Sequence, residues 1–168
     1  MLKVFFMTRK KYIYKGMELF YEKNNEIETK ENFSLFDSLD CFNVAKTSEE
    51  KFFCKHCNDN RPFKKEINLY SLPIYLILQI KKGKSDKYIE YKENIDLKEY
   101  IINPNKTNSI YDLYAVILQK KSLNSCYYLS YCKNFDRWIS YDIEGIDLAN
   151  NIINKDAYIL FYKRSDVE

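Results

Sequence analysis

The sequence predicts an α+β fold, in which a mostly antiparallel, twisted sheet is accompanied by few helices. Hydrophobic residues make up 46% of the 168-residue chain, which is enough for a core, and aromatic residues reach 17%. Tyrosine dominates the aromatic class and suits half-buried sheet surfaces, with its ring packed and its hydroxyl in water. One helical pattern is followed by a series of strand patterns. We therefore expect a single domain over residues 1–168.

The helix is predicted near the start of the chain, over Ser34 to Phe42. Ser34 can cap it, and Asp37, three residues on, can act as the weak partner of a capping box. Leu35, Leu39 and Phe42 line one face. The polar segment 43–50 is expected to end the helix.

Strands are predicted for most of the remaining chain, as apolar or alternating runs bounded by polar residues. The run from Ile74 to Ile80 is almost continuously apolar, which is typical of a strand buried on both faces. A polar turn is expected to extend through Pro62, and a short helical turn over 148–153. The predicted strands are 2–8, 12–21, 65–70, 74–80, 111–119, 126–132, 138–142 and 157–162.

Charge and targeting signals exclude several classes of partner. The net charge is only +3, and the short lysine clusters at 9–11, 81–84 and 120–121 are typical of solvated loops or strand ends. No nucleic-acid-binding motif accompanies them. The apolar start is too short for a signal peptide or a membrane span. Five cysteines, an odd number, argue against a disulfide scaffold and favour an intracellular location, cytoplasmic or nuclear.

The segment Cys54-Lys55-His56-Cys57 is a metal-like pattern. Two thiolates two residues apart can share one zinc ion, because a tight knuckle directs both sulfurs to the same point. A structural zinc site needs four ligands, and the chain has no second CxxC. Cys41 and His56 are conceivable additional ligands. The alternative is a vestigial half-site with free thiols, without a cofactor.

Catalytic groups are scarce. His56 is the only histidine, so a Cys–His or Ser–His–Asp arrangement would have to use it. Its position between two cysteines favours an incidental neighbour of thiols over a general base. The residues alone indicate a β-rich intracellular domain and no specific reaction.

An ordered set of motifs resembles the ubiquitin-specific proteases, in particular their multi-domain branch. The similarity covers residues 32–164, and each motif occurs in the order expected for that family. The helix is similar to SLxDCLxxF, and Leu72-Pro73 opens a segment similar to LPxxLxxxLKRF. The matching segments are 34–39, 53–57, 69–82, 102–105, 111–116, 131–134, 138–142 and 157–164.

The resemblance implies the palm sheet and part of the finger ribbon, which is the papain-like half without the helical thumb. A sheet without that thumb should expose apolar surface. We therefore expect self-association or a protein partner that covers the missing half.

The family cleaves the isopeptide bond after the last glycine of ubiquitin, using a cysteine, a histidine and an acid. This chain contains no cysteine box of the type GNTCYMNS and no first CxxC of the family's zinc ribbon. Counting between the flanking motifs places the family's histidine at Tyr127, its glycines at 124–126 and its acid at Asp142. A phenol cannot deprotonate a thiol at neutral pH as an imidazole does. Cys126 and Cys132 are interpreted as small strand residues, not as replacement nucleophiles.

Two functions follow from the resemblance. The first is a catalytically inactive module that binds ubiquitin, a related modifier or another protein. The alternative is the C-terminal part of an active cysteine-type deubiquitinase whose nucleophile lies upstream or on another chain. Tyr127 argues against the alternative, because a restored nucleophile would still lack its base.

Overall fold

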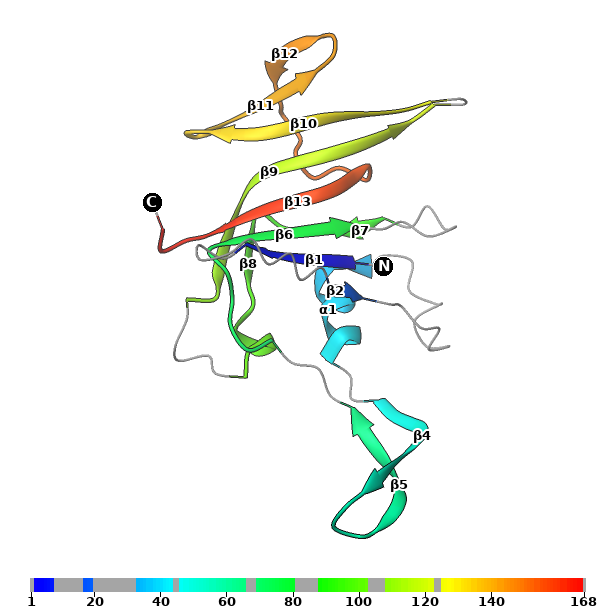
Figure 1. Ribbon diagram of the computed structural model, residues 1–168. Helices are drawn as coiled ribbons and strands as arrows, with labels where there is room; N and C mark the ends of the chain where they lie inside the picture. Colours follow the sequence, from blue (N-terminus) through cyan, green and yellow to red (C-terminus); the bar gives the residue numbers. More distant parts are fainter. Residues whose placement is uncertain are drawn as a thin grey trace.

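A large sheet dominates the computed structural model, which describes residues 2–7, 17–19, 33–43, 46–65, 69–80, 88–102, 108–122 and 125–167. Its strands lie in the order β12-β11-β10-β9-β13-β6-β1-β2, and β8 pairs with β9 beside this path (Figure 1). All of these strand pairs are antiparallel. The predicted antiparallel sheet is confirmed.

The strands of this sheet differ in length, and β9 is the longest with 12 residues. The predicted strands at 2–8, 74–80, 111–119, 126–132, 138–142 and 157–162 each overlap a strand of the sheet. Much of the predicted strand 12–21 lies outside the described residues. The strands are β1 (Leu2–Met7), β2 (Met17–Leu19), β6 (Tyr75–Ile80), β8 (Asn94–Asp96), β9 (Ile110–Lys121), β10 (Cys126–Asn134), β11 (Arg137–Asp142), β12 (Gly145–Leu148) and β13 (Ala157–Arg164).

Two small sheets and two short helices complete the described fold. In Figure 1 the β4–β5 hairpin projects away from the main sheet, and we call it the finger hairpin. No helix in the described part of the chain is long and apolar enough to span a bilayer. The remaining elements are β3 (Phe33–Ser34), which pairs in parallel with β7 (Ile89–Glu90), the helix α1 (Leu35–Asn43), β4 (Lys46–Cys54), β5 (Asp59–Lys65) and the 3-10 helix η1 (Lys98–Tyr100).

Helix α1 begins with a reciprocal capping box. The backbone N–H of Asp37 donates to the Ser34 hydroxyl oxygen at 3.1 Å, and the Asp37 carboxylate accepts from the Ser34 backbone N–H at 2.7 Å. These two bonds satisfy groups that the first turn leaves unpaired. Leu35 and Leu39 are buried on the face toward the sheet. The predicted helix is confirmed to within one residue at its start and end.

The core lies on one face of the main sheet. Leu78 of β6 is paired with Leu160 of β13, which in turn is paired with Val116 of β9, and all three side chains are fully buried. The prediction that 74–80 is buried on both faces is wrong, because burial alternates along β6. Tyr75 on the other face keeps 39% of its surface exposed.

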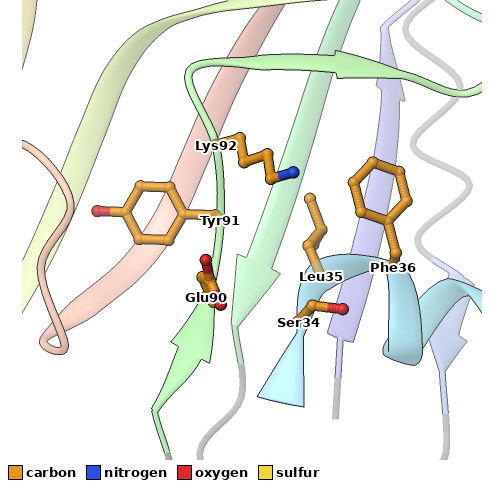
Figure 2. A pocket seen from close by; sticks show the side chains of 6 residues that line it. All are labelled: Ser34, Leu35, Phe36, Glu90, Tyr91 and Lys92. Carbon is orange, nitrogen blue, oxygen red and sulfur yellow. The ribbon is translucent and has the colours of Figure 1, made fainter. Parts of the chain in front are cut away.

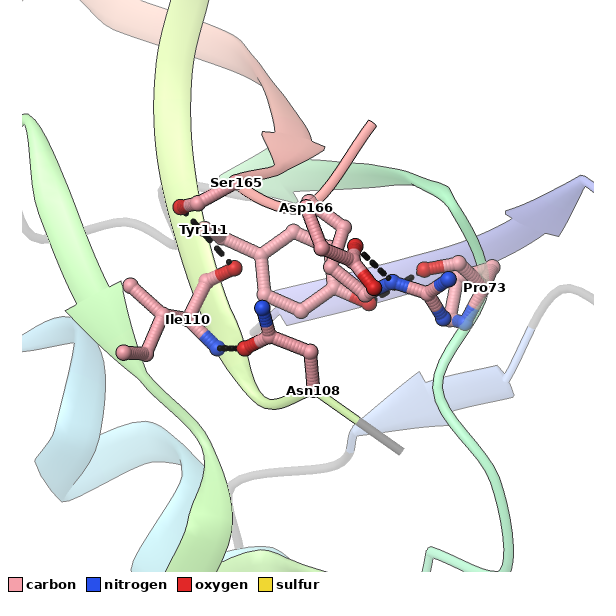
Figure 3. Close-up of polar contacts among 7 residues, drawn as sticks. Pro73, Asn108, Ile110, Tyr111, Ser165 and Asp166 are labelled. Carbon is pink, nitrogen blue, oxygen red and sulfur yellow. Dashed lines mark hydrogen bonds and ion pairs between the residues drawn. The ribbon is translucent and has the colours of Figure 1, made fainter. Parts of the chain in front are cut away.

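Hydrogen bonds fix the end of β13 against the start of β9 (Figure 3). The buried Tyr111 hydroxyl donates to the carbonyl of Pro73, and the Ser165 hydroxyl donates to the carbonyl of Ile110 at 3.2 Å. The backbone N–H of Ile110 donates to Asn108 Oδ1 at 3.0 Å. Together they link the start of β9, the segment before β6 and the chain that follows β13.

The predicted helical turn at 148–153 is wrong. Leu148 ends β12, and residues 149–153 have no regular structure. The backbone N–H of Ala149 donates to the Trp138 carbonyl at 2.9 Å, and the Ile152 carbonyl accepts from the Tyr91 hydroxyl at 2.5 Å. The backbone groups that a helix would pair internally are therefore bonded to β11 and to a distant side chain.

The predicted boundaries of the finger hairpin are also wrong. Strand β4 starts at Lys46, inside the polar segment 43–50 for which only the end of the helix was predicted, and β5 covers Asp59–Lys65, where a turn through Pro62 and a later strand were expected. Pro62 lies opposite Lys51 in this two-stranded sheet, whose open edges tolerate proline. The later predicted strand, 65–70, leaves only an isolated bridge between Leu69 and Ile101; residues 66–68 lie outside the described residues.

Candidate functional site

The first candidate site lies where β10 begins beside the end of β9. Tyr127 is opposite Lys120, and Cys126 is opposite Lys121. Tyr127 keeps 41% of its surface exposed. The next residue, Tyr128, accepts a 2.9 Å hydrogen bond from the side-chain amide of Gln119. The predicted strand end is confirmed, and it presents phenols at its surface.

A cation is held beside Tyr127 by an ion pair. The Lys120 ammonium lies 2.5 Å from a carboxylate oxygen of Asp156, just before β13. The hydrogen bond from this ammonium to Asp156 raises the pKa of Lys120, against the opposing effect of burial. Lys120 therefore stays protonated at neutral pH. Of the three lysine clusters noted in the sequence, the one at 120–121 therefore contains an ion pair. The clusters at 9–11 and 81–84 lie outside the described residues.

Asp142, the second predicted site residue, lies at the end of β11. It pairs with Gly145 of β12, and a two-residue turn connects them. Its Oδ1 accepts the backbone N–H of Ile143 at 2.6 Å. Gly145 has φ +145°, a conformation that residues with a Cβ rarely adopt. The carboxylate thus supports the turn of the β11–β12 hairpin.

The fold brings Tyr127 and Asp142 to the same end of neighbouring strands. Strands β10 and β11 are antiparallel, with Ser130 opposite Tyr141. The start of β10 therefore lies beside the end of β11. None of the hydrogen bonds found between described side chains joins Tyr127 to Asp142. The two residues share an end of the sheet without forming a bonded pair.

The only histidine of the chain is remote from this end. His56 lies in the turn of the finger hairpin, in a different sheet from Tyr127 and Asp142. Figure 1 shows the finger hairpin on the opposite side of the molecule from β10–β12. Cys126 is exposed and Cys132 is half-buried, and both belong to β10. Neither thiol has an imidazole from this chain beside it.

The second candidate site is the dithiol knuckle of the finger hairpin. Cys54 ends β4 opposite Asp59, the first residue of β5, and both thiols are free. Backbone N–H groups of Cys57 and His56 hydrogen bond to the Cys54 sulfur, and these bonds lower the pKa of the Cys54 thiol. The Cys57 side chain also bonds to that sulfur. The fold thus brings the two sulfurs together, as the CxxC spacing predicts.

The knuckle does not by itself fit the closed zinc site that the resemblance implies. A structural zinc needs four ligands, and the described residues contain no group of three or more His, Cys, Asp or Glu side chains able to hold a metal. Helix α1, which carries Cys41, ends before the hairpin begins at Lys46. Cys54 lies at the other end of β4, eight residues after Lys46. An extended strand of that length spans up to about 26 Å.

A small cavity at the start of α1 was not predicted. It has a volume of about 220 Å³ and is lined by residues from β3, α1 and the segment after β7 (Figure 2). Glu90 and Lys92 bring opposite charges to it. It is smaller than the usual ligand pocket. No local pattern could have revealed it, because its walls come from segments about 55 residues apart. The lining residues are Ser34, Leu35, Phe36, Glu90, Tyr91 and Lys92.

Comparison with known proteins identifies the family. The family model described as ubiquitin carboxyl-terminal hydrolase matches residues 22–162. The chain belongs to this family. The resemblance drawn from the ordered motifs is therefore confirmed, and the sheet described above is part of the catalytic-domain fold of that family.

The chain corresponds to only part of its relatives. It is 28% identical to human ubiquitin carboxyl-terminal hydrolase 15 over 177 residues, which is 94% of this chain and 18% of the relative. It is 30% identical to ubiquitin carboxyl-terminal hydrolase 10 of Arabidopsis thaliana over 149 residues, which is 80% of this chain and 16% of the relative. The chain thus spans less than a fifth of the length of these relatives.

Solved structures of the family share the fold. A SAGA Ubp8/Sgf11/Sus1/Sgf73 DUB module bound to ubiquitin aldehyde matches with a TM-score of 0.68 and 22% identity, over 81% of this chain and 34% of that chain. A SAGA DUB module bound to monoubiquitin matches with a TM-score of 0.70 and 19% identity, over 99% of this chain and 40% of that chain. This confirms the predicted partial fold, mostly antiparallel with few helices.

Proposed function

We propose that this member of the ubiquitin carboxyl-terminal hydrolase family binds ubiquitin or a related modifier without cleaving it. Membership of the family supports a role in the ubiquitin system. The structural relatives named above are described as bound to ubiquitin aldehyde or to monoubiquitin. The likeness of the sheet to those structures supports a ubiquitin-facing surface on this chain.

The observation that carries the lack of cleavage is the phenol at the position of the family's histidine. Counting along the family's motifs places that histidine at Tyr127, which lies exposed at the start of β10. A phenol lacks the basic nitrogen with which an imidazole accepts the proton of a thiol. The neighbouring Lys120 is protonated in its ion pair with Asp156, so it cannot accept the proton of a thiol either.

The position of His56 supports the same conclusion. A general base must lie within hydrogen-bond reach of the proton it removes. His56 is the only imidazole in the sequence, and it lies on the finger hairpin, away from the end of the sheet that carries Tyr127 and Asp142. Asp142, at the position of the family's acid, has its Oδ1 bonded to the turn that follows it.

The end of the sheet around Tyr127 is suited to binding. Tyr127 is exposed on one face of β10, and Tyr128 and Tyr141 are exposed on the other face; tyrosine offers a large apolar ring with a polar tip and few rotatable bonds. Tyr128 also lies against Tyr158 of β13, with 5.8 Å between the ring centroids. We place part of the modifier's contact on the exposed ring of Tyr127.

The test of the missing reaction combines a substrate and a reactive probe. The 168-residue chain is incubated with a fluorogenic C-terminal amide of ubiquitin and, separately, with ubiquitin that carries a thiol-reactive group at its C-terminus. We expect no release of fluorophore and no covalent adduct, while an active family member gives both under the same conditions.

Turnover of the amide would contradict the proposal and favour the alternative, an active deubiquitinase. An adduct that disappears in Cys126→Ser or Cys132→Ser would identify a nucleophile within this chain. An adduct that both variants retain would point to another cysteine and would contradict the proposal equally.

A further inference from the structure

Strand β12 is an open edge of the main sheet. Within the described residues it pairs only with β11, and it stands at one end of the strand order (Figure 1). The backbone N–H of Ala149 donates to the Trp138 carbonyl at 2.9 Å, which fixes which residues of β12 bond to β11, because these alternate along an antiparallel pair. The N–H and C=O groups of Ile146 and Leu148 therefore point away from β11, toward the open edge.

The edge is only partly protected by its own side chains. The Leu148 N–H donates to Oδ1 of Asp147 at 2.7 Å, so a carboxylate stands where a partner strand would accept this bond. An ionised carboxylate only accepts hydrogen bonds, so it gives no donor to the outward carbonyls of Ile146 and Leu148. The backbone N–H groups of an added strand supply such donors. The edge thus keeps the groups that strand addition uses.

The two faces of this edge differ in chemistry. Side chains alternate along a strand, so Ile146 and Leu148 lie on one face and Asp147 lies on the other. Ile146 and Leu148 keep 71% and 54% of their surface exposed, and Ile146 lies opposite the exposed Tyr141. The register with β11 places Asp142 on the same face as Asp147. Residues 137–148 carry three carboxylates and one guanidinium, so one face is apolar and the hairpin is acidic.

We propose that the open edge of β12 binds an extended segment of a partner protein in which apolar residues alternate with lysine or arginine. A residue opposite Ile146 or Leu148 shares their face, where an apolar side chain removes surface from water. The residue between these two shares the face of Asp147, where a cation pairs with the carboxylate. A second copy of β12 brings the same carboxylates to the edge instead, and like charges on adjoining strands are destabilising. The site does not use Tyr127, so the inference goes beyond the proposed function and does not rest on it.

The test titrates the isotopically labelled 168-residue chain with the capped peptide Val-Lys-Val-Lys-Val, followed by NMR. We expect saturable shifts of the Ile146 and Leu148 amides, with a dissociation constant on the order of millimolar. The peptide Val-Glu-Val-Glu-Val should bind at least about threefold more weakly, because its charges meet those of the hairpin. Equal binding of the two peptides, or no shift of these amides, would overturn the inference. A mass that doubles in sedimentation, with no peptide bound, would show that a second copy occupies the edge.

Matched variants assign the contact to β12. Asp147→Lys should reverse the preference, so that the glutamate peptide binds more tightly than the lysine peptide. Glu99→Lys makes the same charge change at an exposed residue of η1 and should keep the original preference. Ile146→Pro removes the outward N–H, which proline tolerates on an edge strand, and should abolish the binding of both peptides. The amide signals of the main sheet check that each variant keeps its fold. A preference that survives Asp147→Lys, or binding that is unchanged in Ile146→Pro, would contradict the assignment.

Discussion

At the scale of single residues, several buried tyrosines add hydroxyl hydrogen bonds to a core built mainly of apolar side chains. The hydroxyls of Tyr91, Tyr111 and Tyr162 donate to main-chain carbonyls, and all three side chains are buried. The Tyr100 hydroxyl donates to the Asp40 carboxylate at 2.7 Å. The composition predicted tyrosines with hydroxyls in water, which is wrong for these four residues. Burial of a polar tip is tolerated because each tip has a partner.

Tyr162→Phe should lower the free energy of unfolding by about 1 to 2 kcal/mol. The ring stays in place, but the Lys92 carbonyl loses the 2.7 Å bond from the hydroxyl inside the core. Tyr128→Phe is the matched control, because its hydroxyl is exposed and its bond to Gln119 can be replaced by water. Urea unfolding of both variants checks this, and equal losses would contradict it.

The buried tyrosines also predict how stability depends on alkaline pH. Burial raises the pKa of Tyr91 to about 12, and burial also raises the pKa of Tyr111 and Tyr162. In the unfolded chain these phenols titrate near pH 10. Below pH 10 both states are protonated, so stability does not depend on these groups. Above pH 10 the unfolded state loses its protons first, so stability falls as the pH rises.

The expected fall is at most about 1.4 kcal/mol per pH unit for each buried tyrosine, beginning near pH 10. Urea unfolding at a series of alkaline pH values measures it, with tyrosinate absorbance recorded in parallel. Tyr162→Phe should show a shallower dependence than the unchanged chain. A stability that stays level through pH 11 would contradict the account.

At the scale of elements, the sequence patterns predicted those whose signals are local. Helix α1 could be predicted because Ser34, Asp37 and the buried leucines lie within two turns of one another. Strand β10 could be predicted from its local run of aromatic and apolar residues, and Tyr127, the position to which the motif count assigned the family's histidine, lies near its start. Strand β4 could not, because Lys46–Glu50 is polar and is paired only by the long-range register with β5. The position of Asp142 beside the start of β10 could not be predicted either, because it follows from the register between β10 and β11.

Ser34→Ala tests the capping box and should lower the free energy of unfolding by about 1 kcal/mol. The change removes the oxygen that accepts the Asp37 backbone N–H at 3.1 Å. Ser34→Thr keeps an equivalent oxygen and serves as the control. Urea unfolding distinguishes the two variants, and a threonine variant as weak as the alanine variant would count against the cap.

At the scale of the whole molecule, the described sheet leaves large apolar side chains in solvent along one edge. Phe135 and Ile143 lie in the two turns that flank β11. Ile146 and Leu148 lie on β12, the edge strand. The expectation that a sheet without the family's thumb exposes apolar surface concerns a different part of the fold and stays a prediction. Edge strands of this kind promote association between chains.

Ile146→Lys should reduce self-association while changing the free energy of unfolding by no more than about 0.5 kcal/mol. Ile146 is exposed on β12, so the added charge opposes edge-to-edge contact without disturbing the core. Light scattering over a concentration series measures the effect. An unchanged concentration dependence would show that this edge is not the contact.

The most direct test of the central claim is a titration of isotopically labelled mono-ubiquitin with the unlabelled chain, followed by NMR over hours. We predict saturable shifts with a dissociation constant on the order of micromolar, and a ubiquitin spectrum that remains otherwise intact. A titration of the chain carrying Tyr127→Ala should give weaker binding if the exposed rings of β10 contribute. No shift at high micromolar concentration would contradict the binding of ubiquitin, and cleavage of a C-terminally extended ubiquitin would contradict the lack of catalysis.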